Sequence, residues 1–182
     1  MIKWHDQAGR ERWRDEFVEQ FLQKYGIARD SLSDSTLDCL DDWARQVFLV
    51  EERPSANFNA VVLNLCRAVE SELAAGLGSV AGLEFLADPT PLGNKAHDLR
   101  KVTMDSSLRQ RLLARGIKPG IISALPKKLL DLATIRKDTD SAHGGAEIGE
   151  ATQEDAQKTI HLAGIILRDL IPTQAMGKPR TF

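Results

Sequence analysis

The sequence predicts an all-α protein, a bundle of about six or seven helices. Apolar side chains recur every three or four residues along most of the chain, which is the period of an α-helix. No run alternates between apolar and polar residues between two turn signals, as a half-buried strand would. The length of 182 residues suits one domain, with room for an N-terminal appendage.

The first two helices are expected within residues 1–56, which we assign to an N-terminal extension. Aromatic residues recur at every fourth position and predict a helix over 8–25, which Gly26 ends. These aromatic residues are Trp13, Phe17, Phe21 and Tyr25. Ser35 is the predicted N-cap of a second helix, and the Arg-Pro-Ser sequence at 53–55 ends that helix because proline cannot continue it.

A third helix, predicted over 57–77, carries Glu70 at the margin of its apolar face. A carboxylate in such a position is costly unless it is paired or reaches water. Glu70 therefore extends to solvent, pairs with the neighbouring Arg67, or faces Arg136 across a pair of packed helices. Residues 76–91 are rich in Gly, Ala, Asp and Pro and predict a connection with weak helical character.

Two short helices are expected next, over 92–102 and 106–115, and Gly116 ends the second. A long helix follows over 121–142. Pro126 falls inside this range. Because proline is tolerated in the first helical turn, the regular part of the helix is predicted to begin there.

The last helix is predicted over 153–171. Thr152 stands at its N-cap position and Asp155 follows three residues later, which is the pattern of a capping box. Residues 172–182 hold few apolar side chains and are assigned to a flexible tail. With the N-terminal extension set apart, residues 57–171 form a bundle of four to five helices.

Charge is distributed unevenly along the chain, although the net charge is only −2. The segment from Lys95 to Lys137 contains eleven Lys or Arg and three Asp or Glu, an excess of +8. Residues 1–94 contain nine basic and sixteen acidic residues, a balance of −7. Basic surfaces attract the phosphates of nucleic acids. The alternative is that these charges scatter over solvated helix faces.

The composition argues against a membrane protein, a disulfide scaffold and a metalloprotein. No apolar run approaches the ~20 residues that span a bilayer, and the N-terminus lacks a signal peptide's apolar region, so a cytoplasmic location is expected. Cys39 and Cys66 are far apart and are most simply core thiols. The four His residues have no metal-ligand spacing, so neither a metal nor a cofactor is expected.

The most distinctive group of side chains lies at the end of the long helix. Arg136 and His143 are seven residues apart, nearly two helical turns, and Asp140 falls between them on the same face. Arginine presents a bidentate fork to phosphate oxygens, and histidine accepts or donates protons near neutral pH. Such a row can bind a phosphate and move a proton. It can equally form a salt-bridged last turn exposed to solvent.

The sequence around this row resembles the HEPN superfamily, whose members are small helical bundles found in bacterial toxins, phage-defence proteins and other RNA-cutting systems. The family carries an Arg, four to six intervening residues and a His near a helix end; Arg136 and His143 are separated by six. The likeness covers about 57–171. Other similar stretches are the Arg–Glu pattern at 67–70, Leu-Gly at 92–93, the apolar run 129–135, Ala-His-Gly at 142–144 and the polar helix start at 152–156.

One residue departs from the family pattern. The position after the Arg is often Asn or another small polar residue, whereas here it is Lys137. Lysine adds a contact to phosphate but accepts no hydrogen bond. The departure therefore concerns catalysis rather than fold.

The resemblance implies a metal-independent endoribonuclease that acts as a homodimer, in a prokaryotic toxin–antitoxin or antiviral abortive-infection system. It implies a composite site at the dimer interface, in which Arg136 and His143 are catalytic and Asp140 and Glu70 hold them in place. RNA is the expected partner, with an antitoxin or regulatory protein as a further partner and no membrane. The expected RNA-binding residues are Arg67, Lys127, Lys128 and Lys137.

A second hypothesis is a catalytically inactive HEPN-like module for dimerisation, nucleotide sensing or protein recruitment. Lys137 and the acidic N-terminal extension favour it. A third is a helical scaffold that resembles the family by chance. An open basic cleft at Arg136 favours the nuclease, whereas a site covered by residues 1–50 favours the module or an autoinhibited enzyme.

Overall fold

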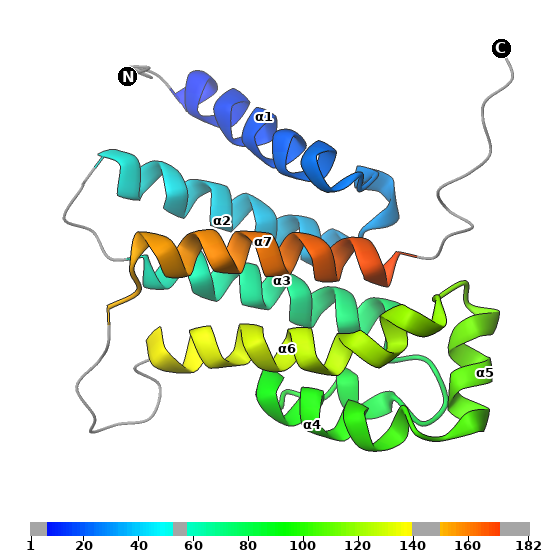
Figure 1. Cartoon of the computed structure of the whole chain (residues 1–182). Helices are drawn as coiled ribbons and strands as arrows, with labels where there is room; N and C mark the ends of the chain where they lie inside the picture. Colours follow the sequence, from blue (N-terminus) through cyan, green and yellow to red (C-terminus); the bar gives the residue numbers. More distant parts are fainter. Residues whose placement is uncertain (1–6, 53–57, 140–149, 172–182) are drawn as a thin grey trace, which may run out of the picture.

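The computed structural model describes residues 7–52, 58–139 and 150–171, and within these ranges it contains seven α-helices, two 3-10 turns and no strand (Figure 1). The all-α prediction is therefore confirmed. None of the described helices combines the length and apolar character that crossing a membrane requires. In chain order the elements are α1 (Gln7–Tyr25), η1 (Arg29–Ser31), α2 (Asp34–Glu52), α3 (Asn59–Leu77), η2 (Glu84–Leu86), α4 (Leu92–Val102), α5 (Ser106–Ala114), α6 (Pro119–Thr139) and α7 (Gln153–Leu170).

α3 lies at the centre of the bundle, where α2, α6 and α7 pack along it. α1 contacts α2 and α7 on one side of the molecule, and α4 packs on α6 on the opposite side (Figure 1). α5 lies across one end of the bundle, next to α6. A single buried cluster extends from Val18 of α1 to Ile171 after α7, so the first two helices share a core with the rest of the chain.

The sequence of α3 explains its central place. Apolar residues fall on several sides of this helix, and a helix of that kind is covered by several neighbours. Full burial of one Leu or Val side chain contributes about 1.5–3 kcal/mol. The fully buried apolar residues of α3 include Val62, Leu65, Val69 and Leu73.

Aromatic rings join α1 to the bundle. Phe17 and Phe21 lie against Trp43 of α2, and their ring centroids are 5.0 and 5.1 Å, respectively, from that of Trp43. Trp43 is buried, so its side chain packs in the core. Tyr25, at the end of α1, lies on Gly164 of α7, where the absence of a side chain leaves room for the tyrosine ring. These contacts fix α1 to two other helices.

Several helix ends follow local chemistry, as predicted. Gly26 and Gly116 end α1 and α5 with φ angles of 67° and 80°, which favour glycine. The capping box of α7 is present: the hydroxyl of Thr152 accepts a hydrogen bond from the Asp155 N–H at 3.1 Å, and the Asp155 carboxylate accepts one from the Thr152 N–H at 3.0 Å.

The predicted N-cap of α2 is wrong. The helix begins at Asp34, and the hydroxyl of Ser33, not that of Ser35, accepts the hydrogen bond of the Thr36 N–H at 3.3 Å. The reason is tertiary. Glu72 of α3, itself buried, accepts hydrogen bonds from the N–H and the hydroxyl of Ser33 at 3.0 and 3.2 Å and fixes Ser33 at the helix start.

The predicted start of the long helix is wrong as well. α6 begins at Pro119. Proline is tolerated there because the N–H groups of the first helical turn have no acceptor within the helix. Pro126 therefore lies inside the helix, where it is buried and cannot donate the usual i→i−4 hydrogen bond. Packing of α6 against α3, α4 and α7 stabilises the helix despite this loss.

We expect Gly164→Ala to lower the free energy of unfolding by about 1–3 kcal/mol, the usual cost of overpacking. The added methyl group would overlap the ring of Tyr25. Urea unfolding followed by circular dichroism measures the loss. Gly120→Ala is the matched control, because nothing lies within 4 Å of a methyl group at that position. An equal loss for Gly164→Ala in a Tyr25→Ala background would contradict the assigned contact.

Candidate active site

The centre of the candidate site is an ion pair between α6 and α3. Nη1 of Arg136 lies 2.8 Å from Oε1 of Glu70, and the two side chains are 25% and 22% exposed. Arg136 continues the stripe of α6 that holds the buried Leu129 and Leu132, which turns it toward α3. Of the three arrangements that the sequence left open for Glu70, the structure has the one in which it faces Arg136, while Arg67 is exposed on α3.

A buried lysine of α4 brings a second cation close to Glu70. Lys95 is only 4% exposed, and its Nζ donates a hydrogen bond to the carbonyl of Leu86 at 2.6 Å. Burial lowers the pKa of Lys95, and the negative charges of Glu70 and Asp88 oppose that shift without cancelling it. Glu70 thus forms an ion pair with Arg136, and its negative charge also acts on the pKa of Lys95.

A hollow of about 540 Å³ opens beside Arg136, between α4 and α6. We call it the Arg136 hollow. α4 approaches α6 closely here, because a side-chain carbon at Gly93 would lie 3.7 Å from the Cβ of Ala133. The residues that line the hollow are Pro91, Leu92, Gly93, Asn94, Leu130, Ala133, Thr134, Arg136 and Lys137.

The N-terminal helices do not line this hollow. All of its lining residues come from α4, α6 and the residue before α4, and α1 lies on the opposite side of the molecule (Figure 1). In the described part of the chain, the surface at Arg136 is therefore open rather than covered by α1 or α2. Because α2 contributes the buried Leu40, Trp43 and Ala44 to the core, removal of residues 1–50 would expose apolar surface rather than uncover the site.

The structure brings only some of the predicted site residues together. Arg136 and the exposed Lys137 line the Arg136 hollow, and Glu70 forms an ion pair with Arg136. Lys127 is exposed about two and a half turns earlier on α6. Asp140 and His143 lie outside the described residues, so their row with Arg136 stays a prediction.

Two predicted RNA-binding residues lie elsewhere. Lys128 forms an ion pair with the buried Asp169 of α7, with Nζ 2.5 Å from Oδ2, and thus joins α6 to α7. Arg67 faces the α2 side of α3, where burial raises the pKa of Cys39 and the charge of Arg67 partly opposes that rise. Neither residue lines the Arg136 hollow.

The sequence analysis missed Lys95, although the sequence contained a signal for it. Leu92, Lys95, Ala96 and Leu99 have the spacing of one helix face, and all four are buried. A lysine on an otherwise apolar stripe must either extend its ammonium group to water or find an acceptor inside the bundle. In this protein it finds the carbonyl of Leu86.

The cysteines do not add a nucleophile to the site. Burial, assisted by the nearby Asp42, raises the pKa of Cys39, so its thiol stays protonated at neutral pH. Cys66 is fully buried, as expected of a core thiol. Among the described residues, no group of three or more His, Cys, Asp or Glu has the arrangement of a metal site.

No family model, curated protein or solved structure matches this chain. The chemistry of the site is therefore inferred from its own side chains. An arginine held by a carboxylate beside a second exposed cation suits an anionic ligand, because a fixed guanidinium loses little freedom when it binds. The planar fork matches the oxygens of a phosphate or a carboxylate.

We expect Lys95→Met to remove a rise in stability with pH. The pKa of Lys95 is lower in the folded state than its usual 10.5, the pKa expected in the unfolded chain. At pH values between the folded and the unfolded pKa, the unfolded chain binds more protons than the folded one. Folding therefore becomes more favourable as pH rises through this window. The free energy of unfolding of the wild type should thus increase relative to that of Lys95→Met across this window. The exposed Lys101→Met serves as control, and a constant difference between wild type and Lys95→Met would contradict a lowered pKa.

Proposed function

We propose that this protein is a HEPN-like, metal-independent endoribonuclease that cuts RNA at a site built around Arg136 and His143. The observation that carries the proposal is the ion pair of Arg136 with Glu70 beside an open hollow, next to the exposed Lys137. Glu70 fixes the guanidinium at the surface where a phosphate would bind. The local excess of +8 between Lys95 and Lys137 supports a polyanionic substrate.

The proposed reaction uses the 2′-hydroxyl of RNA as its own nucleophile. A base takes the proton of the 2′-hydroxyl, the 2′-oxygen bonds to the adjacent phosphorus, and the bond from phosphorus to the 5′-oxygen breaks. An acid protonates the leaving 5′-oxygen, so the products are a 2′,3′-cyclic phosphate and a 5′-hydroxyl. Histidine suits both proton transfers near neutral pH. Arg136 would stabilise the charge that develops on the phosphate oxygens.

A homodimer is part of the proposal. One His143 per chain supplies one proton-transfer group, whereas the reaction needs an acid and a base. A two-fold axis would place His143 and Arg136 of a second copy at the same cleft. Asp140 would then orient an imidazole or restrain Arg136. A nuclease of this kind needs control in a cell, which is consistent with a prokaryotic toxin–antitoxin or antiviral system and with an antitoxin or regulatory protein as partner.

The second candidate is an inactive module that uses the same fold for dimerisation, nucleotide sensing or recruitment. Lys137 favours it, because active family members often have at this position, directly after the Arg, an Asn that accepts a hydrogen bond. The ion pair of Arg136 and Glu70 is also compatible with a purely structural contact between α6 and α3.

We expect the purified wild type to cut mixed cellular RNA in the presence of EDTA and to leave cyclic phosphate ends. His143→Ala should keep its helical circular dichroism spectrum and lose cleavage by about 10²–10⁴-fold, the usual contribution of general acid–base catalysis. His161→Ala is the matched control, since His161 is exposed on α7 outside the Arg136 hollow. Cleavage that is equal in wild type and His143→Ala, or absent from both, would reject the nuclease and favour the inactive module.

A further inference from the structure

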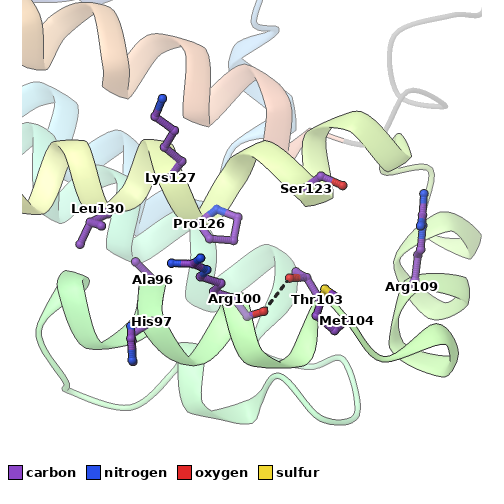
Figure 2. Close-up of a pocket in the computed structure, with 10 residues that line it drawn as sticks. All are labelled: Ala96, His97, Arg100, Thr103, Met104, Arg109, Ser123, Pro126, Lys127 and Leu130. Atoms are coloured by element: carbon purple, nitrogen blue, oxygen red, sulfur yellow. Dashed lines mark hydrogen bonds between the residues drawn. The ribbon is translucent and has the colours of Figure 1, made fainter.

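A second hollow, of about 520 Å³, lies on the same side of the bundle as the Arg136 hollow (Figure 2). We call it the Arg100 hollow. Arg100 extends from α4 toward Pro126 of α6, and Arg109 stands on α5 at the other end. The residues that line it are Ala96, His97, Arg100, Thr103, Met104, Arg109, Ser123, Pro126, Lys127 and Leu130.

The two hollows adjoin each other between α4 and α6. Leu130 lines both, and α4 and α6 supply residues to each. We call this surface the α4–α6 groove. α4 has 11 residues, so the groove extends for roughly 16 Å along that helix, at 1.5 Å per residue. One end of the groove holds Arg136.

The described residues that line the groove carry charges of one sign. None of them is Asp or Glu, whereas six are basic: His97, Arg100, Arg109, Lys127, Arg136 and Lys137. Among the described residues, Arg100, Arg109, Lys127 and Lys137 form no ion pair.

Basic residues next to the groove behave differently. Lys101 pairs with Asp98 at 2.8 Å, and Lys128 pairs with Asp169 at 2.5 Å. Each of them directly follows a groove residue in the sequence, Arg100 or Lys127. Lys101 and Lys128 are thus neutralised by nearby acids, whereas Arg136 is the one groove cation with an acidic partner in the described part of the chain.

This pattern fits an extended polyanion better than a compact ligand. The unpaired cations come from three helices and are spread along the groove, so one small anion would contact only a few of them. Large apolar side chains lie between the cations: Met104 is 88% exposed and Leu130 is 50% exposed. Phosphates that recur along a strand, with bases between them, match such an alternation of cationic and apolar surface.

We propose that the α4–α6 groove binds the backbone of single-stranded RNA and leads the strand to Arg136. In this proposal Arg100, Arg109 and Lys127 bind phosphates on one side of the scissile bond, while Arg136 and Lys137 bind at the bond itself. The choice of RNA as the polymer rests on the proposed function. The groove itself rests on the lining residues and their charge.

The test is fluorescence anisotropy of a labelled 12-nucleotide single-stranded RNA with the full chain carrying His143→Ala, in EDTA and across a salt series. We expect Arg100→Gln/Lys127→Gln to lower the affinity by about tenfold at 50 mM salt. The slope of log K against log salt should fall by about 1.4, or about 0.7 for each lost phosphate contact on a single strand. The matched control, Arg12→Gln/Lys24→Gln, removes one Arg and one Lys from exposed positions of α1 and should change neither quantity.

Equal losses in the groove variant and the control would overturn the proposal, because binding would then depend on net charge alone. Unchanged binding by the groove variant would also overturn it, as would displacement of RNA by polyglutamate at equal charge concentration. Cleavage by the otherwise wild-type chain is measured separately. If the otherwise wild-type chain cleaves RNA and the groove variant binds RNA normally, the proposed groove is rejected and the proposed nuclease is supported. If the otherwise wild-type chain does not cleave RNA and the groove variant still loses RNA binding, the proposed groove is supported and the proposed nuclease is rejected.

Discussion

Because α3 is packed against α2, α6 and α7, each polar side chain that it turns inward needs a partner inside the bundle. Two acidic residues of α3 meet this requirement in different ways. Glu72 accepts hydrogen bonds from Ser33 and Thr36 and sets the start of α2. Glu70 pairs with Arg136 and fixes one side chain of α6. The requirement to pair the buried Glu72 and the half-buried Glu70 thus links the order of the core to the position of the candidate site.

Helices were predictable from the sequence because their signals are local. The spacing of apolar residues, a glycine at positive φ and a capping box each involve residues within about one helical turn of one another. Gly26 and Gly116 end their helices as predicted, and Thr152 and Asp155 form the predicted capping box. Ser33 and Ser35 both carry a suitable hydroxyl, and the choice between them depends on Glu72, which is distant in the sequence. Local chemistry alone could not make that choice.

The same division applies to the site. The sequence limited Glu70 to three arrangements, because a carboxylate at an apolar margin must be paired or reach water, and its contact with Arg136 was one of them. Lys128 was among the residues assigned to RNA, yet Asp169, which is distant in the sequence, forms an ion pair with it in the fold. Whether a cation is available to a ligand depends on acids brought close by tertiary structure, and net charge along the chain does not contain that information.

The close approach of α4 to α6 at Gly93 and Ala133 has a consequence for how this protein can diverge. The separation of the two helices is limited here by the smallest side chains, so one methyl group would fit and a larger residue would push the helices apart. The width of the surface between them can therefore change through two uncharged positions. A descendant chain can thus come to accept a bulkier or slimmer ligand while every charged residue stays the same.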